Sequence, residues 1–451
     1  MNGVIPAWRR WLTATITAFA LAFAANARTS GQVSGNWTGT LDEHPSIQYS
    51  TRPTEDRVAR WARQFAERRE SLTRDGRSGY LRSLLGALGI PVESQLLVFS
   101  KTGVQRDYTS PETPRAIYFN DSVIVAYIPG APAIEIAAHD PQQGVVFYAL
   151  DQNAATAMPT RRTTCLSCHV SASTLNVPGV ITRSNFVAGD GNILPQLGNH
   201  DVDHSTPHPD RWGGWLVTSE EAPPPYSQRA HQGNITFTLD GATSNEVFVK
   251  WIGSSPRERG YLLSSSDIVA LLAFDHQTHA INLLTKLNWE WRIAASENRA
   301  SVADAELRRL VNEVADYLLF AGEAPMPVPL TPPAGFASHL QSRHPRDRQG
   351  RSCAQLELVD HLSRYPCSYM VYSDAFDGLP QPVRRAVYGR MIEALSGRPD
   401  DARFARVSMQ ERRAALEILD ETKPDFRSAA QGAPDPWPQQ VGSRRFLTGP
   451  W

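Results

Sequence analysis

The feature that most constrains this chain of 451 residues is the run Cys165-Leu166-Ser167-Cys168-His169. Two thiols at this spacing, followed directly by a histidine, are typical of covalent haem attachment. Each thiol adds across a vinyl group of the macrocycle and forms a thioether, and the adjacent imidazole reaches the iron as proximal ligand. The alternative is a redox-active Cys-x-x-Cys pair with an incidental histidine, but no thioredoxin-like strand and helix surround the motif. We therefore predict one covalently attached haem c, with Cys165 and Cys168 as thioether residues and His169 as iron ligand.

The first 27 residues have the pattern of a secretory signal peptide. Arg9 and Arg10 form a basic start, a short run of Ala, Thr, Phe and Leu follows, and Ala25-Asn26-Ala27 is a small-residue cleavage site. The apolar run is too short and too rich in threonine to favour a membrane anchor. Because haem is attached to exported chains outside the cytoplasm, the signal peptide and the motif support each other. We expect a periplasmic protein with no membrane anchor after cleavage.

Charge and length limit the classes of partner and of architecture. The chain carries 45 basic and 46 acidic residues, and the signal peptide would remove two of the arginines. There is no long basic stripe for nucleic acid and no acidic block for a cationic partner, so we expect no nucleic-acid partner. A simple electron carrier needs about 100 residues, whereas this length predicts two or three structural units.

Periodicity predicts an α+β fold, mainly helical, with a small antiparallel sheet before the haem motif. Short β-branched and aromatic runs separated by turn residues predict strands over 96–99, 117–119, 123–128, 134–137 and 145–150. Apolar residues at helical spacing predict helices from residue 54, and over 79–88, 267–286, 302–321 and 383–395. Ser264 to Ser266 are expected to cap the 267–286 helix. A proline-rich stretch over 325–333 is expected to be a linker.

We expect four regions along the chain. They are the signal peptide (1–27), N-terminal helices plus the antiparallel sheet (28–160), the cytochrome c haem-binding segment (161–240) and a helical C-terminal region (241–451). The loop-rich part after the motif is expected to cover the haem. Within it, Arg211-Trp212-Gly213-Gly214-Trp215 has two interpretations. The arginine binds a haem propionate while an indole packs on the ring, or the run is a tight turn that leads into a strand.

The sixth iron ligand separates an electron carrier from an enzyme, because an open position permits peroxide or oxygen chemistry. The first methionine after Met158 is Met326, so a methionine shortly downstream of the motif is ruled out as ligand, and only the distant Met326, Met370 or Met391 could still fold back to the iron. Histidines are better supplied, both in the loop-rich part and at the apolar stripe of the 267–286 helix. We take His204 and His276 as candidate distal ligands. The alternative is that they are hydrogen-bonded core histidines.

The remaining two cysteines, Cys353 and Cys367, are candidates for a disulfide in an oxidising compartment. The closed loop would be short, and the bond would contribute ~3 kcal/mol through the entropy of the unfolded chain. Two free, buried thiols are the alternative.

The motif makes this chain resemble the c-type cytochromes, and the chain from the motif to about residue 424 resembles large exported single-haem proteins. The matching stretches are Asp203-His204-Ser205-Thr206-Pro207, Arg211-Trp212-Gly213-Gly214-Trp215, His231-Gln232-Gly233-Asn234, Phe274-Asp275-His276-Gln277, Ser368-Tyr369, Asp374-Ala375-Phe376 and Glu421-Thr422-Lys423-Pro424. The resemblance implies haem c, electron transfer and an exported location, but no substrate. Larger haem peroxidases and rubber-type oxygenases typically carry two such motifs, and this chain has one.

Two functions follow as expectations. The first is a periplasmic mono-haem c-type cytochrome that transfers electrons to or from a redox partner protein. The second is a haem c enzyme, peroxidase- or oxygenase-like, with an open distal site and a substrate pocket in the helical half. The sequence identifies no catalytic residue for the second.

Overall fold

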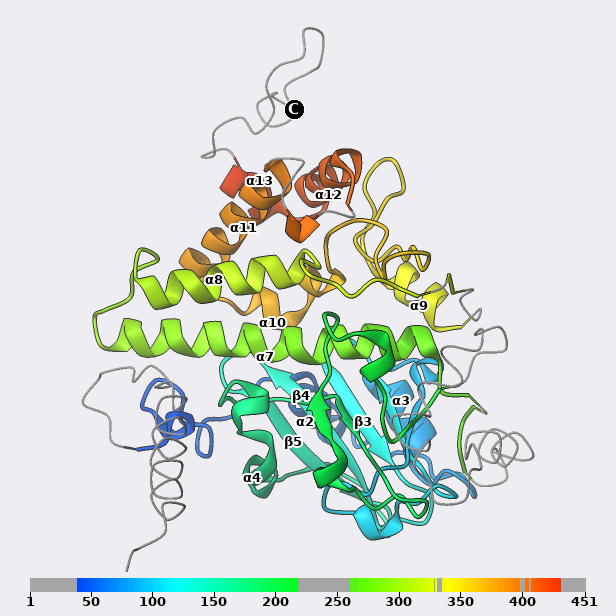
Figure 1. Cartoon of the computed structure of the whole chain (residues 1–451). Helices are drawn as coiled ribbons and strands as arrows, with labels where there is room; N and C mark the ends of the chain where they lie inside the picture. The colour runs from blue at the N-terminus through cyan, green and yellow to red at the C-terminus, as the bar shows by residue number, and fades with distance from the viewer. Residues whose placement is uncertain are drawn as a thin grey trace, which may run out of the picture. The chain divides into compact units, whose positions relative to one another are not determined.

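The computed structural model describes residues 39–217, 260–263, 265–327, 329–330, 335–397, 402–404 and 407–430. The signal peptide predicted over residues 1–27 and the His231 stretch lie outside these residues. The described residues from Leu41 onward belong to one compact unit. The predicted α+β fold class is confirmed, because helices pack around an antiparallel sheet (Figure 1).

The described residues form a seven-stranded sheet in the order β6-β5-β4-β3-β2-β1-β9, with antiparallel neighbours throughout. Its strands are β1 (Leu96–Val98), β2 (Arg115–Phe119), β3 (Val123–Tyr127), β4 (Ala133–Asp140), β5 (Gly144–Asp151), β6 (Thr160–Arg161) and β9 (Trp215–Leu216). The five strands predicted before the motif are all present. A separate hairpin pairs β7 (Arg183–Asn185) with β8 (Asn199–Asp201).

The edge strands determine where the motif lies. β6 precedes the motif at one edge of the sheet, and β9 follows it at the other edge. Residues 162–214 therefore have to cross from one edge to the other. The motif helix α4 (Leu166–His169) belongs to this crossing, and the His169 ring contacts Phe147 of β5. Figure 1 shows α4 and the green chain after it in front of the sheet.

Two helices predicted before the sheet cover one of its faces. They are α2 (Arg57–Glu67), which buries Val58 and Phe65, and α3 (Leu81–Leu88). The Asp56 side chain caps α2 by accepting hydrogen bonds from two backbone N–H groups, and it also accepts one from the Tyr148 hydroxyl of β5. Gly89 ends α3 in the left-handed conformation at φ +62°, which a glycine adopts without steric cost.

The opposite face packs against α7 (Ile268–Ser296), which runs across the upper end of the sheet in Figure 1 and has α8 (Ala305–Leu318) on its other side. We call this face, which carries Phe119, Val145 and Phe147, the α7 face of the sheet. The rings of Phe119 and Phe274 lie 4.9 Å apart across this interface. A helix covered on both sides is buried nearly all round, which is why α7 is longer and less amphipathic than predicted.

The C-terminal half is helical, as expected. Its further helices are α9 (Phe336–Arg343), α10 (Asp374–Asp377), α11 (Gln381–Ser396), α12 (Met409–Thr422) and α13 (Pro424–Ala430). Of the stretch expected as a linker, the structure describes residues 325–327, 329 and 330. The three described prolines are exposed, whereas Met326 and Leu330 are buried, and their backbone N–H groups donate to the carbonyls of Asp360 and Leu358. These two residues therefore anchor the described part of the stretch to the C-terminal half.

The cap of α7 differs from the prediction. Ser266 does not cap the helix, because its hydroxyl oxygen accepts a hydrogen bond from the backbone N–H of Leu97. Asp267 is the N-cap, and its carboxylate accepts from the N–H groups of Val269 and Ala270. Burial raises the pKa of Asp267 from 3.8 to about 6, although these two hydrogen bonds lower it.

This raised pKa predicts a pH-dependent stability that Asp267→Asn removes. Between pH 4 and pH 6 the native state holds a proton that the unfolded state releases, so this group's contribution to stability falls as pH rises. Over this pH range the free energy of unfolding falls by about 3 kcal/mol at most because of this group. Asparagine keeps the cap and cannot titrate. Urea unfolding from pH 4 to pH 6 should show a flatter profile for the variant, with Asp304→Asn at the exposed cap of α8 as control.

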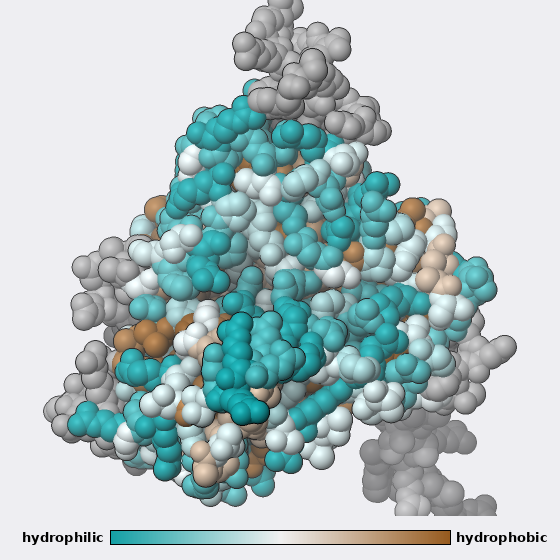
Figure 2. All heavy atoms as spheres, turned by 180° about the vertical axis from the view of Figure 1, so that it is seen from behind, coloured by the Kyte–Doolittle hydropathy of each residue, from teal (hydrophilic) through white to brown (hydrophobic). Residues whose placement is uncertain are grey.

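The surface of the described residues is mostly polar on the side seen in Figure 2, where hydrophobic side chains lie in small separate groups. Among the helices that the structure describes, we find none long and apolar enough to span a membrane.

Candidate functional site

The structure brings the three predicted haem-binding residues together on one helical turn. A 3-10 turn over Thr163–Cys165 leads directly into α4. Residues three apart lie on the same side of a helical turn, so both thiols point to one side next to His169. Cys165 is half-buried against the core and Cys168 is exposed, and both are free thiols.

The His169 ring is held through one nitrogen only. Its Nδ1 lies 2.8 Å from the carbonyl oxygen of Gly179, so Nδ1–H donates and Nε2 carries the lone pair. Nε2 has no hydrogen-bond partner among the described residues. The ring packs against Phe147 with 4.5 Å between centroids. Burial lowers the pKa of His169, and the charge of Arg115 lowers it further. This is a neutral imidazole oriented by its other nitrogen, the form in which histidine binds metals.

The carbonyl that orients His169 is itself held from α7. The side chain of Asn282 accepts from the N–H of Val180 at 3.0 Å and donates to its carbonyl at 2.7 Å. Gly179 leaves room for this contact, because a Cβ there would lie 2.2 Å from Asn282 Oδ1. Gly179 also donates from its N–H to the carbonyl of His169. The helix thus positions the imidazole through the backbone of residues 179–180.

Replacing Asn282 with alanine should lower the unfolding free energy by about 1–3 kcal/mol, because two buried backbone groups lose their partner. It should also loosen His169, seen as faster exchange of the Nδ1 proton in nitrogen-15 histidine spectra. Asn288→Ala is the matched control. Asn288 is equally buried in α7 and donates to two backbone carbonyls, those of Pro141 and Gly378. The control should lose stability without changing His169, and equal exchange rates in the two variants would contradict the positioning role.

Beside His169, the α7 face of the sheet presents short apolar side chains. Ile124, Ala126 and Ala137 are only partly buried, and Ala137 pairs directly with Phe147. Glu135 lies in the same row as Ala126. This surface is apolar and partly exposed, as one wall for a flat macrocycle needs to be.

Two charged groups on this face are incompletely satisfied. Arg115 is 8% exposed, and its Nε is buried without a hydrogen-bond partner, as is Oε1 of the half-buried Glu135. After burial, the charge of Arg115 contributes to lowering the pKa of His169, and the charge of Glu135 contributes to raising the pKa of Cys165. The sequence analysis missed both residues. The available signal was a lone charge within an apolar strand, as in Ala133-Ile134-Glu135-Ile136-Ala137.

These observations fit a haem. Two thiols and an imidazole nitrogen without a partner meet on one turn, beside an apolar surface and two orphaned polar atoms. In the part of the chain that the structure describes, no group of three or more His, Cys, Asp or Glu side chains could hold a metal ion. A haem iron takes four ligands from the macrocycle, so a single histidine of this chain is sufficient as proximal ligand.

The two candidate distal ligands lie together, in a buried network between α7 and α8. Nδ1 of His204 is 2.7 Å from Nδ1 of His276, and Nε2 of His276 is 2.6 Å from the hydroxyl of Ser368. Their rings stack on Tyr317. Burial lowers the pKa of His204 to about 3 and that of His276 well below its usual value, so both are neutral.

Hydrogen bonding engages three of the four ring nitrogens of this pair. One Nδ1 donates to the other, and His276 Nε2 pairs with the hydroxyl of Ser368. Both nitrogens of His276 are therefore used inside the protein. A distal role for His276 requires one of these bonds to be exchanged for iron, which favours the alternative of a core histidine.

The run around Arg211 forms a buried turn. The Arg211 guanidinium donates to the carbonyls of Thr206 and His204 and lies 3.5 Å from Asp275, while Trp212 Nε1 donates to Asp275 at 2.9 Å. These contacts use the arginine inside the protein. They support the interpretation as a tight turn into β9 over propionate binding.

The structure brings together Cys353 and Cys367, the two candidates for a disulfide, and describes no disulfide between them. Both are free, buried thiols. A hydrogen bond with Cys353 contributes to raising the pKa of Cys367, after burial. The Tyr372 hydroxyl also donates to Cys353 Sγ at 3.7 Å. The thiols satisfy each other as hydrogen-bonding groups, which is the alternative weighed for them.

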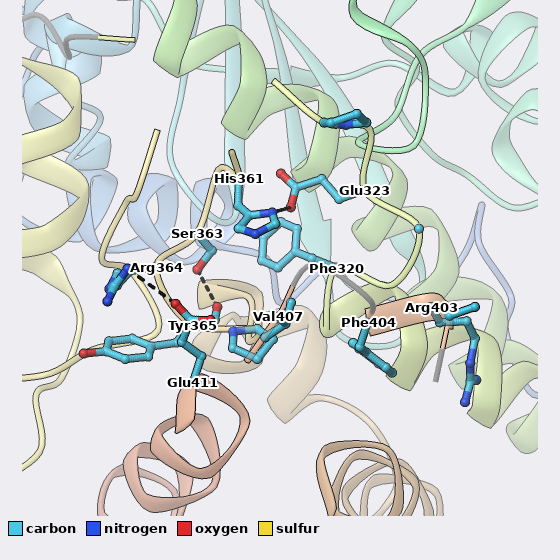
Figure 3. Close-up of a pocket in the computed structure, with 14 residues that line it drawn as sticks. Phe320, Glu323, His361, Ser363, Arg364, Tyr365, Arg403, Phe404, Val407 and Glu411 are labelled. Atoms are coloured by element: carbon cyan, nitrogen blue, oxygen red, sulfur yellow. Dashed lines mark hydrogen bonds and ion pairs between the residues drawn. The ribbon is translucent and has the colours of Figure 1, made fainter. Parts of the chain in front are cut away.

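A pocket of about 270 Å³ lies in the C-terminal half (Figure 3). Its charged residues are matched in pairs: Glu323 lies 3.9 Å from His361, and Arg364 lies 3.4 Å from Glu411. Arg403 at its edge pairs with Asp316 outside it. None of the motif residues lines this pocket, so it offers no substrate site next to His169.

Comparison of the chain with protein-family models, curated proteins and solved structures found no match.

Proposed function

We propose that this protein is a mono-haem c-type cytochrome that transfers electrons between periplasmic partners. The single observation that supports this most is the state of His169. Its Nδ1 proton is engaged by Gly179 and its Nε2 has no partner among the described residues, on the same turn as two free thiols. Cys165 and Cys168 would hold the macrocycle, and His169 would bind its iron.

The haem would supply one-electron chemistry when bound. The chain's own residues contribute position and environment. Asn282 and Gly179 orient the imidazole, and Phe147 packs against it. Burial disfavours protonation of His169, so its lone pair stays available at neutral pH. Periplasmic location rests on the predicted signal peptide, and a redox partner protein is part of the same proposal.

A second candidate is a haem c enzyme with an open distal site, peroxidase- or oxygenase-like. The observation that favours it is the hydrogen bonding of His204 and His276, which engages Nδ1 of His204 and both ring nitrogens of His276 inside the protein. Met326, Met370 and Met391, the distant methionines, are buried in the large core.

The test is the optical spectrum of the exported, purified protein, ferric and ferrous, with and without carbon monoxide. Haem that survives on a denaturing gel would support covalent attachment. A low-spin spectrum that carbon monoxide does not change would support the electron carrier. A high-spin ferric band, or a ferrous form that binds carbon monoxide, would support the enzyme. Absence of covalent haem after export by a host with the attachment machinery would contradict both.

A further inference from the structure

We propose that Arg115 binds a propionate carboxylate of the haem held at His169. This inference rests on the proposed function and adds the residue that anchors the rim of the cofactor. The burial of Arg115, its Nε without a partner and its place on the sheet support this role.

Arg115 is a buried cation without a counter-charge in contact. Its two terminal nitrogens donate to the hydroxyl and the carbonyl of Thr102, and its Nε is buried without a partner. No described carboxylate lies within ion-pair distance of it. Burying an unpaired charge destabilises the folded state, and a buried donor without an acceptor destabilises it further. A group that brings a negative charge and acceptor oxygens would remove both effects.

The sheet register places Arg115 on the same face as the motif. Side chains alternate between faces along β2, and Ile117 and Phe119 lie in the core on the α7 face. Arg115 shares their parity. His169 packs against Phe147 of β5, and β2 lies three strands from β5 in the sheet, so Arg115 is on the face that carries the motif but away from the imidazole. A macrocycle whose iron sits on His169 carries its propionates at the rim, away from the iron.

The position of Glu135 explains why Arg115 has no counter-charge within the described chain. Glu135 lies on the same face, and its charge only partly offsets the lowering of the Arg115 pKa by burial, because the two groups do not form an ion pair. Both keep a buried polar atom without a partner. The opposite charges are thus held apart within one apolar surface. A carboxylate is the chemical class that an arginine fork recognises, through two parallel N–H···O bonds.

Arg211, the residue that the sequence offered for this role, is a poorer candidate. Its guanidinium already donates to two carbonyls and lies against Asp275. The Nε of Arg115 has no partner, and Arg115 lies on the face of the sheet against which the motif packs.

The experiment labels the haem propionates with carbon-13 in the full, exported chain and records the reduced-minus-oxidised infrared difference spectrum. The variants are Arg115→Lys and Arg115→Gln. Arg161→Lys is the control, because Arg161 also has an orphaned Nε but pairs with Tyr148 on the opposite face of the sheet. The labelled carboxylate band should shift in both Arg115 variants and stay in place in the control. Arg115→Gln should also lower the reduction potential, because the loss of a nearby positive charge favours the oxidised iron. Each tenfold shift of this one-electron equilibrium corresponds to 59 mV.

The outcomes separate the two proposals. Covalent haem with an unshifted band in both Arg115 variants overturns the role of Arg115 and leaves the cytochrome proposal standing. A wild-type chain without covalent haem overturns the cytochrome proposal, and the role of Arg115 with it. If the glutamine variant does not accumulate, the lysine variant decides, because it keeps the charge and changes only the donor geometry.

Discussion

Replacement of both Cys165 and Cys168 by alanine should abolish covalent haem attachment. The two thiols lie on one turn next to His169, and thioether bonds have no other anchor there, because Cys353 and Cys367 are buried in the C-terminal core. The expected result is complete loss of haem staining on a denaturing gel, with the protein still exported. Pyridine haemochrome spectra of the purified variant check this.

Two controls separate attachment from ligation. Cys353→Ala with Cys367→Ala removes the other thiol pair and should leave the haem in place. His169→Ala keeps both thioethers and removes the proximal ligand, so any attached haem should have a changed spectrum. Covalent haem in the Cys165/Cys168 double variant, or an unchanged spectrum in His169→Ala, would contradict the assignment.

Asp275→Ala should lower the unfolding free energy by about 3–5 kcal/mol, because it leaves a buried cation without its partner. Asp275 is fully buried in α7, and its Oδ2 lies 3.5 Å from Arg211 and accepts from Trp212 Nε1. Arg211 is 2% exposed, so solvent cannot replace the lost charge. The measurement is urea unfolding at pH 8, above the pKa of Asp275, which burial raises to about 7.

The matched control is Asp374→Ala. The Arg60–Asp374 pair has the same separation of 3.5 Å, but its side chains are 43% and 48% exposed. An exposed pair contributes up to about 1 kcal/mol. Similar losses in the two variants would show that burial does not determine the strength of the Asp275 contact.

The prediction of elements succeeded where the signal is local. The strands over 96–150 follow from β-branched runs between turn residues, and β1 to β5 lie where these runs are. The helix predicted over 302–321 is found as α8, because one face of it is apolar. The amphipathic interpretation of α7 was wrong, since the sheet and α8 cover it from both sides and hide the stripe that periodicity would show.

The candidate site was predictable in its chemistry but not in its surroundings. The spacing of Cys165, Cys168 and His169 predicts their common turn, because three residues span one turn of helix. Nothing local predicts Gly179 as the partner of His169, or Arg115 as an unpaired cation. The pair of His204 and His276 shows the same limit: the sequence offered both as iron ligands, and the fold uses both in hydrogen bonds to each other.

By itself, the sequence determined the fold class, most strands and helices, and the three residues of the motif. These depend on neighbours within a turn of helix or a strand. Only the tertiary structure decided which carbonyl orients His169 and which arginine stays unpaired. Those outcomes depend on residues far apart in the chain, such as Asn282 and Val180, which are separated by 102 positions. Burial then determines their charge and hydrogen bonding, and burial is a property of the packed chain.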